Sequence, residues 1–193
     1  MDQDAYNIFS ALVTDETRRT ELECRDYVHY AAFYLLPTRP IEVYTENEHR
    51  NFFGSSDFIV AARLRNDQGR EENYAYIWEL KAPQSFLFES DDNKNRFRPT
   101  LDFVKAENQL LHYYSEAEGN NNFRERYKVM NTKNIKIGGL IIGRSDRLAK
   151  GLGSSPLDEQ NVAKALSVRE NYLYATYKIR ILTWDAILKA VQP

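Results

Sequence analysis

Two apolar segments joined by a polar turn constrain the fold of this chain more than any other stretch. Residues 57–65 and 73–81 are rich in apolar side chains, and the seven residues between them have the composition of a turn. Folding the chain about Gln68 pairs the two segments and brings Asp57 opposite Glu79, because each lies eleven positions from Gln68. The sequence therefore predicts a β-hairpin with that register to within a residue or two.

The predicted hairpin brings three charged side chains together. Successive side chains of a strand face opposite ways, so Glu79 and Lys81 share one face while Trp78 and Leu80 fill the other. The register adds Asp57 to the two charged groups. Two carboxylates at that separation repel each other unless a cation lies between them, and carboxylate oxygens suit a hard ion such as Mg²⁺. The pattern predicts a divalent metal site.

A solvent-exposed ion pair is the alternative interpretation of Glu79 and Lys81. On a solvated strand edge such a pair contributes only about 0.2–1 kcal/mol. In this sequence both charges are flanked by the apolar residues 77, 78 and 80. Charges inside an apolar strand cost free energy unless they have a partner or a task, which favours the metal site.

The spacing of apolar residues predicts the elements around the hairpin. Spacing by three and four is typical of a helix, alternation of a strand, and a continuous apolar run of a buried strand. These patterns predict a helix over residues 14–36, a strand over 41–44, a helix over 100–118, a buried strand over 135–143, a helix over 157–171, a strand over 174–182 and a closing helix from residue 183. Residues 1–13 read as a lead-in segment and the polar residues 89–98 as an exposed loop.

The charged residues of the hairpin match a known motif. Asp57 followed by Glu79-Leu80-Lys81 fits the Asp-x(n)-Glu-x-Lys pattern of the PD-(D/E)XK nuclease fold. Over roughly residues 21–144 the chain resembles the nuclease domain of the Shedu anti-phage defence proteins. The matching segments are residues 56–58, 78–83, 106–113 and 139–144. This ordered series is much more specific than Glu-x-Lys alone, which is common on solvated strand edges.

The resemblance implies an architecture of the α/β class. It implies a restriction-endonuclease-like αβββαβ core with a mixed central sheet flanked by helices. That core would cover about residues 14–144, and residues 145–193 would add a helix, a strand and a helix. All 193 residues would then form a single nuclease-like domain.

The resemblance also implies roles for individual residues. Asp57 and Glu79 would hold Mg²⁺, for which Mn²⁺ can substitute, and the backbone carbonyl of Leu80 would be a third ligand. Lys81 would orient or deprotonate the attacking water. Gln109, which matches the family's helix glutamine, would position the lysine or the water through its amide.

Further residues are candidates for the same site. The fold often brings an acid from its first helix to the metal, which points to Glu21 or Glu23, with a merely solvated helix glutamate as the alternative. Basic side chains that could contact a phosphate backbone are Lys94, Arg96, Arg98, Lys105 and Arg144. For residues 94–98 a solvated connector is the alternative interpretation.

Composition limits the classes of function. A formal net charge of −2 argues against a generally basic nucleic-acid-binding surface, so any contact with DNA must come from a local patch. Cys24 is the only cysteine, which excludes an internal disulfide and fits a reducing cytoplasm. The chain has no apolar run of 18 residues and no signal-peptide pattern, so we expect a soluble, cytoplasmic protein without a membrane partner.

These features lead to three hypotheses about function. The first is a metal-dependent endonuclease that hydrolyses phosphodiester bonds of DNA, most simply double-stranded, in anti-phage or foreign-DNA defence. The second is a nucleic-acid-binding or assembly module that keeps the fold without cutting. The third is a toxin-like nuclease that cleaves RNA, because the metal chemistry on the phosphate is the same. Symmetry makes a dimer or tetramer the expected state of an enzyme that cuts both strands.

Overall fold

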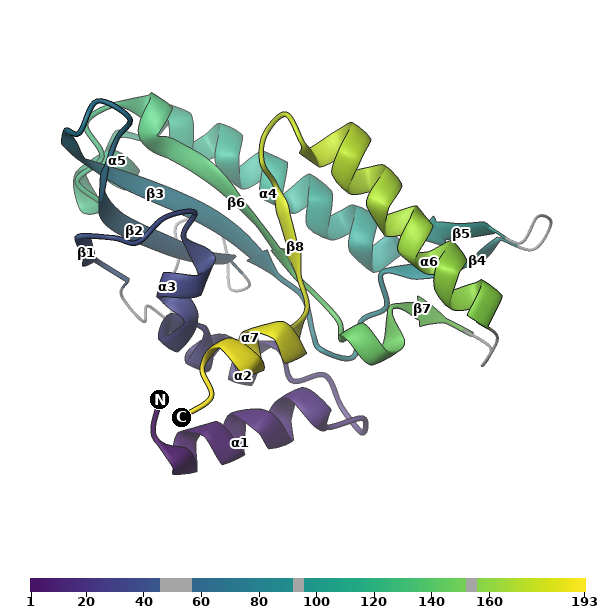
Figure 1. Cartoon of the computed structure of the whole chain (residues 1–193). Helices are drawn as coiled ribbons and strands as arrows, with labels where there is room; N and C mark the ends of the chain where they lie inside the picture. Colours follow the sequence, from purple (N-terminus) through teal and green to yellow (C-terminus); the bar gives the residue numbers. More distant parts are fainter. Residues whose placement is uncertain (46–56, 92–95, 152–155) are drawn as a thin grey trace.

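A five-stranded mixed sheet forms the centre of the computed structural model, which describes residues 1–45, 57–91, 96–151 and 156–193 (Figure 1). The strand order is β1-β2-β3-β6-β8. β1, β2 and β3 are antiparallel neighbours, whereas β6 and β8 continue the sheet in parallel. The strands are β1 (Glu42–Val43), β2 (Asp57–Arg65), β3 (Glu71–Leu80), β6 (Ile135–Ile141) and β8 (Arg180–Leu182). The predicted α/β class and the mixed sheet are confirmed.

β2 and β3 form the predicted hairpin in the predicted register. Asp57 pairs with Glu79 at the open end of the hairpin. At the turn, the side-chain oxygen of Asn66 accepts hydrogen bonds from the backbone N–H groups of Gln68, at 3.0 Å, and Arg70, at 2.9 Å. An asparagine that bonds the backbone two residues ahead stabilises a tight turn, and the turn then fixes the register of the strands.

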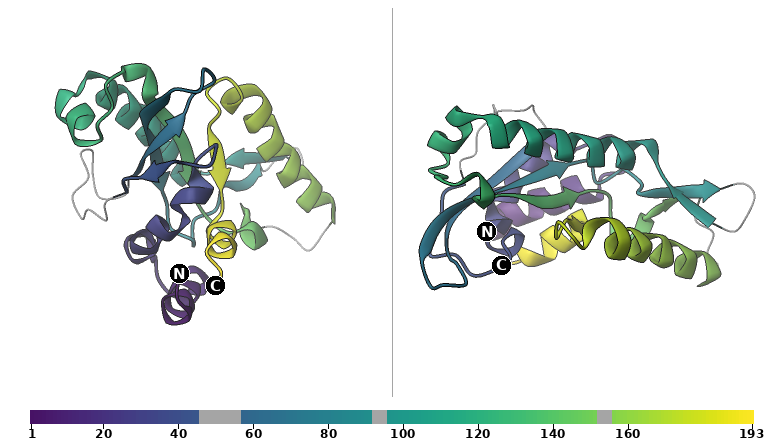
Figure 2. Two further views of the ribbon diagram at one scale, coloured as in Figure 1. Left: turned by 60° about the vertical axis from the view of Figure 1, so that its left-hand side comes forward. Right: turned by 90° about the horizontal axis from the view of Figure 1, so that it is seen from above.

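Helices cover both faces of the sheet (Figure 2). One face carries α4, and the opposite face carries the N-terminal helices together with the C-terminal helix α7. Their bounds are α1 (Gln3–Thr14), α2 (Glu21–Val28), α3 (Ala32–Leu35), α4 (Leu101–Gly119) and α7 (Trp184–Ala190). Short helices join them at α5 (Asn121–Arg126), η1 (His29–Ala31), η2 (Thr132–Asn134) and η3 (Ser145–Arg147). The chain is therefore a three-layer arrangement with a hydrophobic cluster on each side of the sheet.

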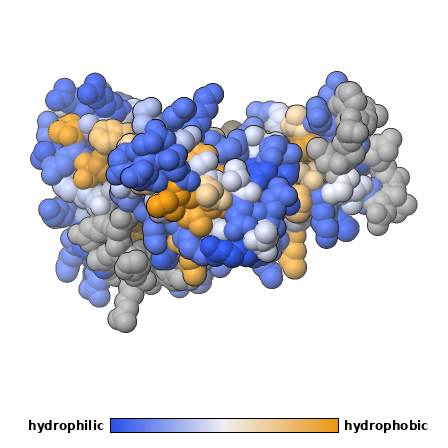
Figure 3. All heavy atoms as spheres, turned by 90° about the horizontal axis from the view of Figure 1, so that it is seen from below, coloured by the Kyte–Doolittle hydropathy of each residue, from blue (hydrophilic) through white to orange (hydrophobic). Residues whose placement is uncertain are grey.

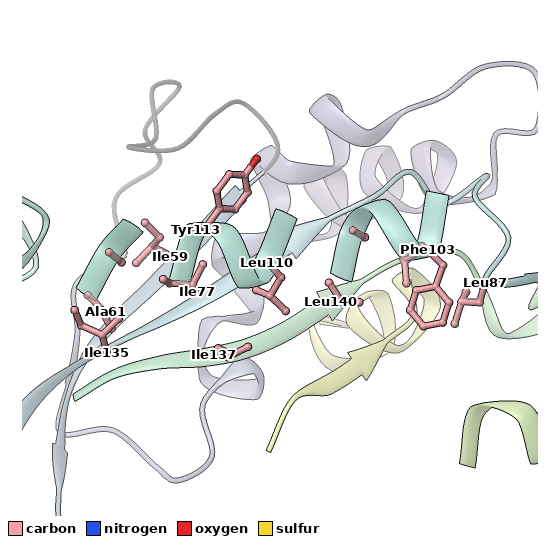
Figure 4. Packing of buried hydrophobic residues seen from close by; sticks show 14 of the residues in the cluster. Ile59, Ala61, Ile77, Leu87, Phe103, Leu110, Tyr113, Ile135, Ile137 and Leu140 are labelled. Atoms are coloured by element: carbon pink, nitrogen blue, oxygen red, sulfur yellow. The ribbon is translucent and has the colours of Figure 1, made fainter. Parts of the chain in front are cut away.

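The α4 side of the sheet is an aliphatic and aromatic core (Figure 4). Phe103 and Leu110 of α4 are almost completely buried against Ile77 and Leu140 of the strands. The helix begins where predicted, because the hydroxyl of Thr100 accepts a hydrogen bond from the backbone N–H of Phe103 at 3.2 Å. Spacing of apolar residues by three and four along α4 supplies the buried stripe.

The N-terminal region differs from the single predicted helix over residues 14–36. Residues 1–13 are not a lead-in segment, because Asp2 caps α1, and Phe9 and Val13, one turn apart, are buried. Asp15 then accepts hydrogen bonds from the backbone N–H and the hydroxyl of Thr17, which makes a turn in place of a continuing helix. The second helix begins only at Glu21.

Two further predicted boundaries were wrong. The polar residues 89–98 are not only a loop, because β4 (Phe88–Asp91) and β5 (Arg96–Pro99) pair and join β7 (Ala149–Lys150) in a second sheet of order β5-β4-β7. The predicted strand over 174–182 is shorter, because α6 (Pro156–Arg169) continues as a π-helical turn, η4 (Glu170–Tyr174). Only the last three residues of that stretch find a strand to pair with, and an alternating pattern cannot form a strand without a neighbour.

A bulge in β6 changes which residues face α4. Ile77 pairs with Ile137 but Trp78 pairs with Gly139, so Gly138 is an extra residue in β6. A Cβ atom on Gly138 would lie 2.3 Å from Nε1 of Trp78, so any larger residue there requires a shift of the indole ring or of the backbone. Before the bulge Ile137 faces α4, and after it Leu140 does. The bulge keeps both apolar residues on the same side of the sheet.

The surface seen from the side of α1 is mostly hydrophilic, with small groups of hydrophobic side chains among the polar ones (Figure 3). Among the described helices, none is both long enough and apolar enough to cross a bilayer.

Candidate active site

The candidate site lies where β3 ends, on the side of the sheet that carries α4. Ile77 packs in the cluster under α4, and Trp78 and Leu80 pack in the opposite cluster. Alternation therefore directs Glu79 toward the α4 side. Nζ of Lys81 lies 2.5 Å from Oε1 of Glu79, so the two charged groups meet on that side as predicted.

The ion pair between Glu79 and Lys81 is buried. The side chain of Glu79 has no exposed surface, and that of Lys81 is 12% exposed. The interpretation as a solvated surface ion pair is therefore wrong. Removing two charges from water is costly, so a pair at this depth implies strong local interactions or a function that requires the charges.

Hydrogen bonds hold the backbone of Lys81 on both sides. Its N–H donates to the carbonyl oxygen of Ile141 at 2.9 Å, which extends the parallel pairing of β3 with β6 by one residue. Its carbonyl oxygen accepts from Nε1 of Trp184 at 2.6 Å. Trp184 is fully buried at the start of α7. The C-terminal helix thus fixes the position of the lysine.

The loop after Lys81 is tied to the segment between α1 and α2. Oε1 of Gln84 accepts from the backbone N–H of Thr20 at 3.1 Å, and Nε2 of Gln84 donates to the carbonyl oxygen of Asp15 at 2.5 Å. Arg19 donates to the hydroxyl of Ser85 at 3.0 Å. The N-terminal segment therefore forms one wall beside the end of β3.

Asp57 and Leu80, the other two predicted metal ligands, lie at the ends of the two hairpin strands. Asp57 is paired with Glu79 in the register of the hairpin, and its side chain lies outside the described part of the structure. Leu80 is the last residue of β3 and is fully buried. Among the described side chains, no three His, Cys, Asp or Glu residues are gathered closely enough to hold a metal ion.

A hard divalent cation fits the donor set at this point. Glu79 supplies a buried carboxylate, the backbone of Asp57 runs directly opposite it, and both residue types bind Mg²⁺ through oxygen. Two carboxylates and one ammonium leave an excess of negative charge, which such a cation would offset.

The two candidate acids of the first helix lie on α2, whose buried residues Cys24 and Val28 pack in the same cluster as Trp78. Glu23 forms an ion pair with Arg18, and this partner lowers the pKa of the Glu23 carboxyl. Glu21 is the first residue of α2 and half-buried. No hydrogen bond or ion pair among the described residues joins either glutamate to the site at the end of β3.

Gln109 lies on α4 beside the buried Leu110 and is itself half-buried. Its Nε2 atom lies 3.5 Å from the hydroxyl of Tyr113, one turn later on the helix. This contact is at the limit of a hydrogen bond, so the amide of Gln109 is not committed to a strong partner there. The role of positioning the lysine or the water stays a prediction.

The basic residues expected to contact phosphate are dispersed. Arg96 and Arg98 are exposed on β5, and Arg98 forms an ion pair with Glu89 of β4 at 3.0 Å. Lys105 is exposed on α4. Lys94 lies outside the described residues.

Arg144 has acidic partners that the sequence patterns did not reveal. Its Nε and one Nη donate to the two carboxylate oxygens of Asp146, at 2.9 and 2.5 Å, and Glu16 lies 3.5 Å away. The hydrogen bonds raise the pKa of Arg144 and lower the pKa of Asp146. The Arg144 side chain is only 12% exposed. Through these contacts Arg144 joins the segment that follows β6 to the segment between α1 and α2.

Sequence patterns also missed Gln84 and Trp184. Gln84 follows the motif by three residues, in a loop with no periodicity, and Trp184 lies 103 residues after Lys81. The one available signal was the residue type of Trp184, since a buried tryptophan usually finds a hydrogen-bond partner for its indole N–H.

Comparison with known proteins identifies the family of the chain. No curated protein matches it. A family model described as "Shedu protein SduA, C-terminal" matches residues 8–188. Since this match spans nearly the whole chain, the protein belongs to the family of Shedu SduA C-terminal domains.

Proposed function

We propose that the chain is a metal-dependent endonuclease of the PD-(D/E)XK type that hydrolyses phosphodiester bonds of DNA in anti-phage defence. Membership of the Shedu family supports a role in defence and links the chain to nuclease activity. The observation that carries the proposal is the buried pair of Glu79 and Lys81 at the end of β3, opposite Asp57.

Phosphodiester hydrolysis needs an activated water, neutralisation of the charge that develops on the phosphoryl oxygens, and stabilisation of the leaving alkoxide. Asp57, Glu79 and the carbonyl of Leu80 would hold Mg²⁺, which supplies electrostatic stabilisation when bound. As an ammonium, Lys81 would orient the attacking water by donating a hydrogen bond to it, because the group has three donors and uses one on Glu79. To deprotonate that water, Lys81 would have to act as the neutral amine, whose lone pair accepts the proton. Trp184 and Ile141 keep Lys81 at the end of the strand for this task.

The experiment that tests the proposal is incubation of the purified chain with supercoiled plasmid, in Mg²⁺ and in EDTA. We expect nicking or linearisation with Mg²⁺, none with EDTA, and loss of at least about a hundredfold in rate on Lys81→Ala. Asp57→Asn and Glu79→Gln should behave in the same way. Lys150→Ala, which removes an exposed lysine on β7, is the matched control and should cut like the wild type. Cutting that survives Lys81→Ala would contradict the proposal.

The alternative is a DNA-binding or assembly module that does not cut. Under this alternative the plasmid would be shifted on a gel without being cut in Mg²⁺ or Mn²⁺. A parallel incubation with RNA distinguishes the DNA endonuclease and the non-cutting module from a toxin-like ribonuclease. The ribonuclease would degrade RNA and leave the plasmid intact.

A further inference from the structure

A separate cavity lies at the uncovered edge of the central sheet. β8 pairs with β6 only from Gly139 onward, so residues 136–138 of β6 have no neighbouring strand on that side among the described residues. A cavity of about 360 Å³ occupies this edge. Tyr76, which lines it, precedes Glu79 by three residues on β3, roughly 10 Å along the strand. Neither Glu79 nor Lys81 lines the cavity.

The lining of this edge cavity combines aromatic rings with positive charge. Its chemically distinctive side chains are those of Tyr76, Tyr114, Tyr177, Lys136, Lys178 and Arg180. No acidic residue lines the cavity in the described part of the chain. These residues come from β3, α4, β6, the turn before β8 and β8 itself, which the fold brings together from distant parts of the sequence. Tyrosines with cations and without acids select an anionic ligand that carries an aromatic ring.

Arg180 is held in place at the cavity without a carboxylate. One of its Nη atoms donates to the carbonyl oxygen of Tyr34 at 3.0 Å, and its guanidinium carbon lies 5.4 Å from the ring centre of Tyr34 and 5.5 Å from that of Trp78. Among the described residues, no ion pair includes Arg180. The residue is half-buried. A partly desolvated guanidinium of this kind gains free energy from a bound anion.

Lys178 adopts a backbone conformation that favours glycine. Its φ is 54°, in the left-handed region, where a side chain costs about 1 kcal/mol or more. Its N–H donates to the carbonyl oxygen of Ala175 at 3.3 Å, and the N–H of Ile179 donates to that of Tyr174 at 3.2 Å, so the turn is well defined. This turn carries the side chain of Lys178 at the rim of the cavity.

A buried donor lies next to the cavity wall. Nε1 of Trp78 is buried and has no hydrogen-bond partner among the described residues. It lies beside Gly138, which lines the cavity and has no side chain to separate them. Buried polar groups are nearly always hydrogen-bonded, so an acceptor on a ligand or an ordered water would stabilise this site.

We propose that this cavity binds one free nucleotide, with the base against the tyrosine rings and the phosphate against the cations. The volume lies at the lower end of the range for small-molecule sites, about 300–1,000 Å³, which fits one nucleotide rather than a strand. The same chemistry exists in the terminal nucleotide of a DNA strand, so the test must separate the two sources.

The test uses the full wild-type chain in EDTA, so that neither metal binding nor metal-dependent cleavage affects the result. AMP, ADP, ATP and GMP are titrated by calorimetry, alongside inorganic phosphate and a 5′-phosphorylated ten-nucleotide single strand. We expect at least one mononucleotide to bind, and Lys178→Gly to weaken it about tenfold, the effect of losing one charge-assisted contact. Because glycine suits the conformation at 178, this variant should fold at least as stably as the parent.

A second cavity variant and a control variant complete the test. Arg180→Gln should weaken binding as well, and Lys189→Ala, which removes an exposed lysine of α7 away from the cavity, should leave it unchanged. The inference is overturned if no mononucleotide binds, if inorganic phosphate binds as tightly as AMP, if only the single strand binds, or if Lys178→Gly and Arg180→Gln both bind normally. Failure of the nuclease proposal would change none of these results.

Discussion

Trp184 donates its indole N–H to the carbonyl oxygen of Lys81 across 103 residues of sequence, at a distance of 2.6 Å. The bond couples the closing helix of the chain to the lysine that we propose as the proton-transfer group. Trp184 also packs edge-on against Phe9 of α1, with ring centres 6.1 Å apart. The beginning and the end of the chain therefore support the same strand end.

Replacing Trp184 by Phe tests this positioning. The variant keeps an aromatic ring but loses the hydrogen bond, so we expect the kcat of plasmid cleavage to fall about tenfold while KM changes little. Ile187→Val, one turn later on α7, is the control, since it loosens the same helix by about 0.5–1.5 kcal/mol without a described contact to Lys81. Equal losses of kcat in the two variants would show that Trp184 acts only through stability.

Breaking the buried ion pair should destabilise the fold. Lys81→Met leaves the carboxylate of Glu79 buried without its ammonium partner, and we expect the free energy of unfolding in urea to fall by about 3–5 kcal/mol. The double variant Glu79→Gln, Lys81→Met removes both charges and should recover part of that loss. A double variant no more stable than Lys81→Met alone would mean that the lost contact is not primarily electrostatic.

Gly138→Ala should destabilise the protein through Trp78. The new Cβ atom would lie 2.3 Å from Nε1 of the indole, so the bulge or the ring must move, at a cost of about 1–3 kcal/mol. Gly119→Ala is the control, because nothing lies within 4 Å of a Cβ atom there and alanine favours the helix. The melting temperatures of both variants, with the tryptophan fluorescence of the native state, check the prediction. Equal melting temperatures would contradict it.

The hydrogen bonds from Arg144 to Asp146 make a pH-dependent contribution to stability. They lower the pKa of the folded-state carboxyl below its ordinary value of 3.8. The contribution is therefore present above pH 3.8 and is lost as the pH falls through the lower folded-state pKa. We expect Asp146→Asn to melt below the wild type at pH 6, with the difference closing in strong acid. The effect should be small, because the Asp146 side chain is largely exposed. A difference that does not change with pH would exclude this ion pair as its cause.

Local patterns were sufficient for the elements on which the site depends. The turn centred on Gln68 determined the pairing of Asp57 with Glu79, since a hairpin register follows from the position of its turn. The periodicity of α4 and the capping residue Thr100 determined that helix in the same way. Where local signals competed, as at Asp15, the turn formed by a side-chain hydrogen bond won over helical spacing.

The sequence alone thus determined the hairpin, its register and the meeting of Glu79 with Lys81, because all three depend on residues within 25 positions of one another. Only the tertiary structure decided that Trp184 holds Lys81, that Glu16 contacts Arg144, and that the tyrosines and cations of the edge cavity converge. Those contacts join distant segments, and they follow from how the two helical layers pack on the sheet. The periodicity of a single segment carries no information about such packing.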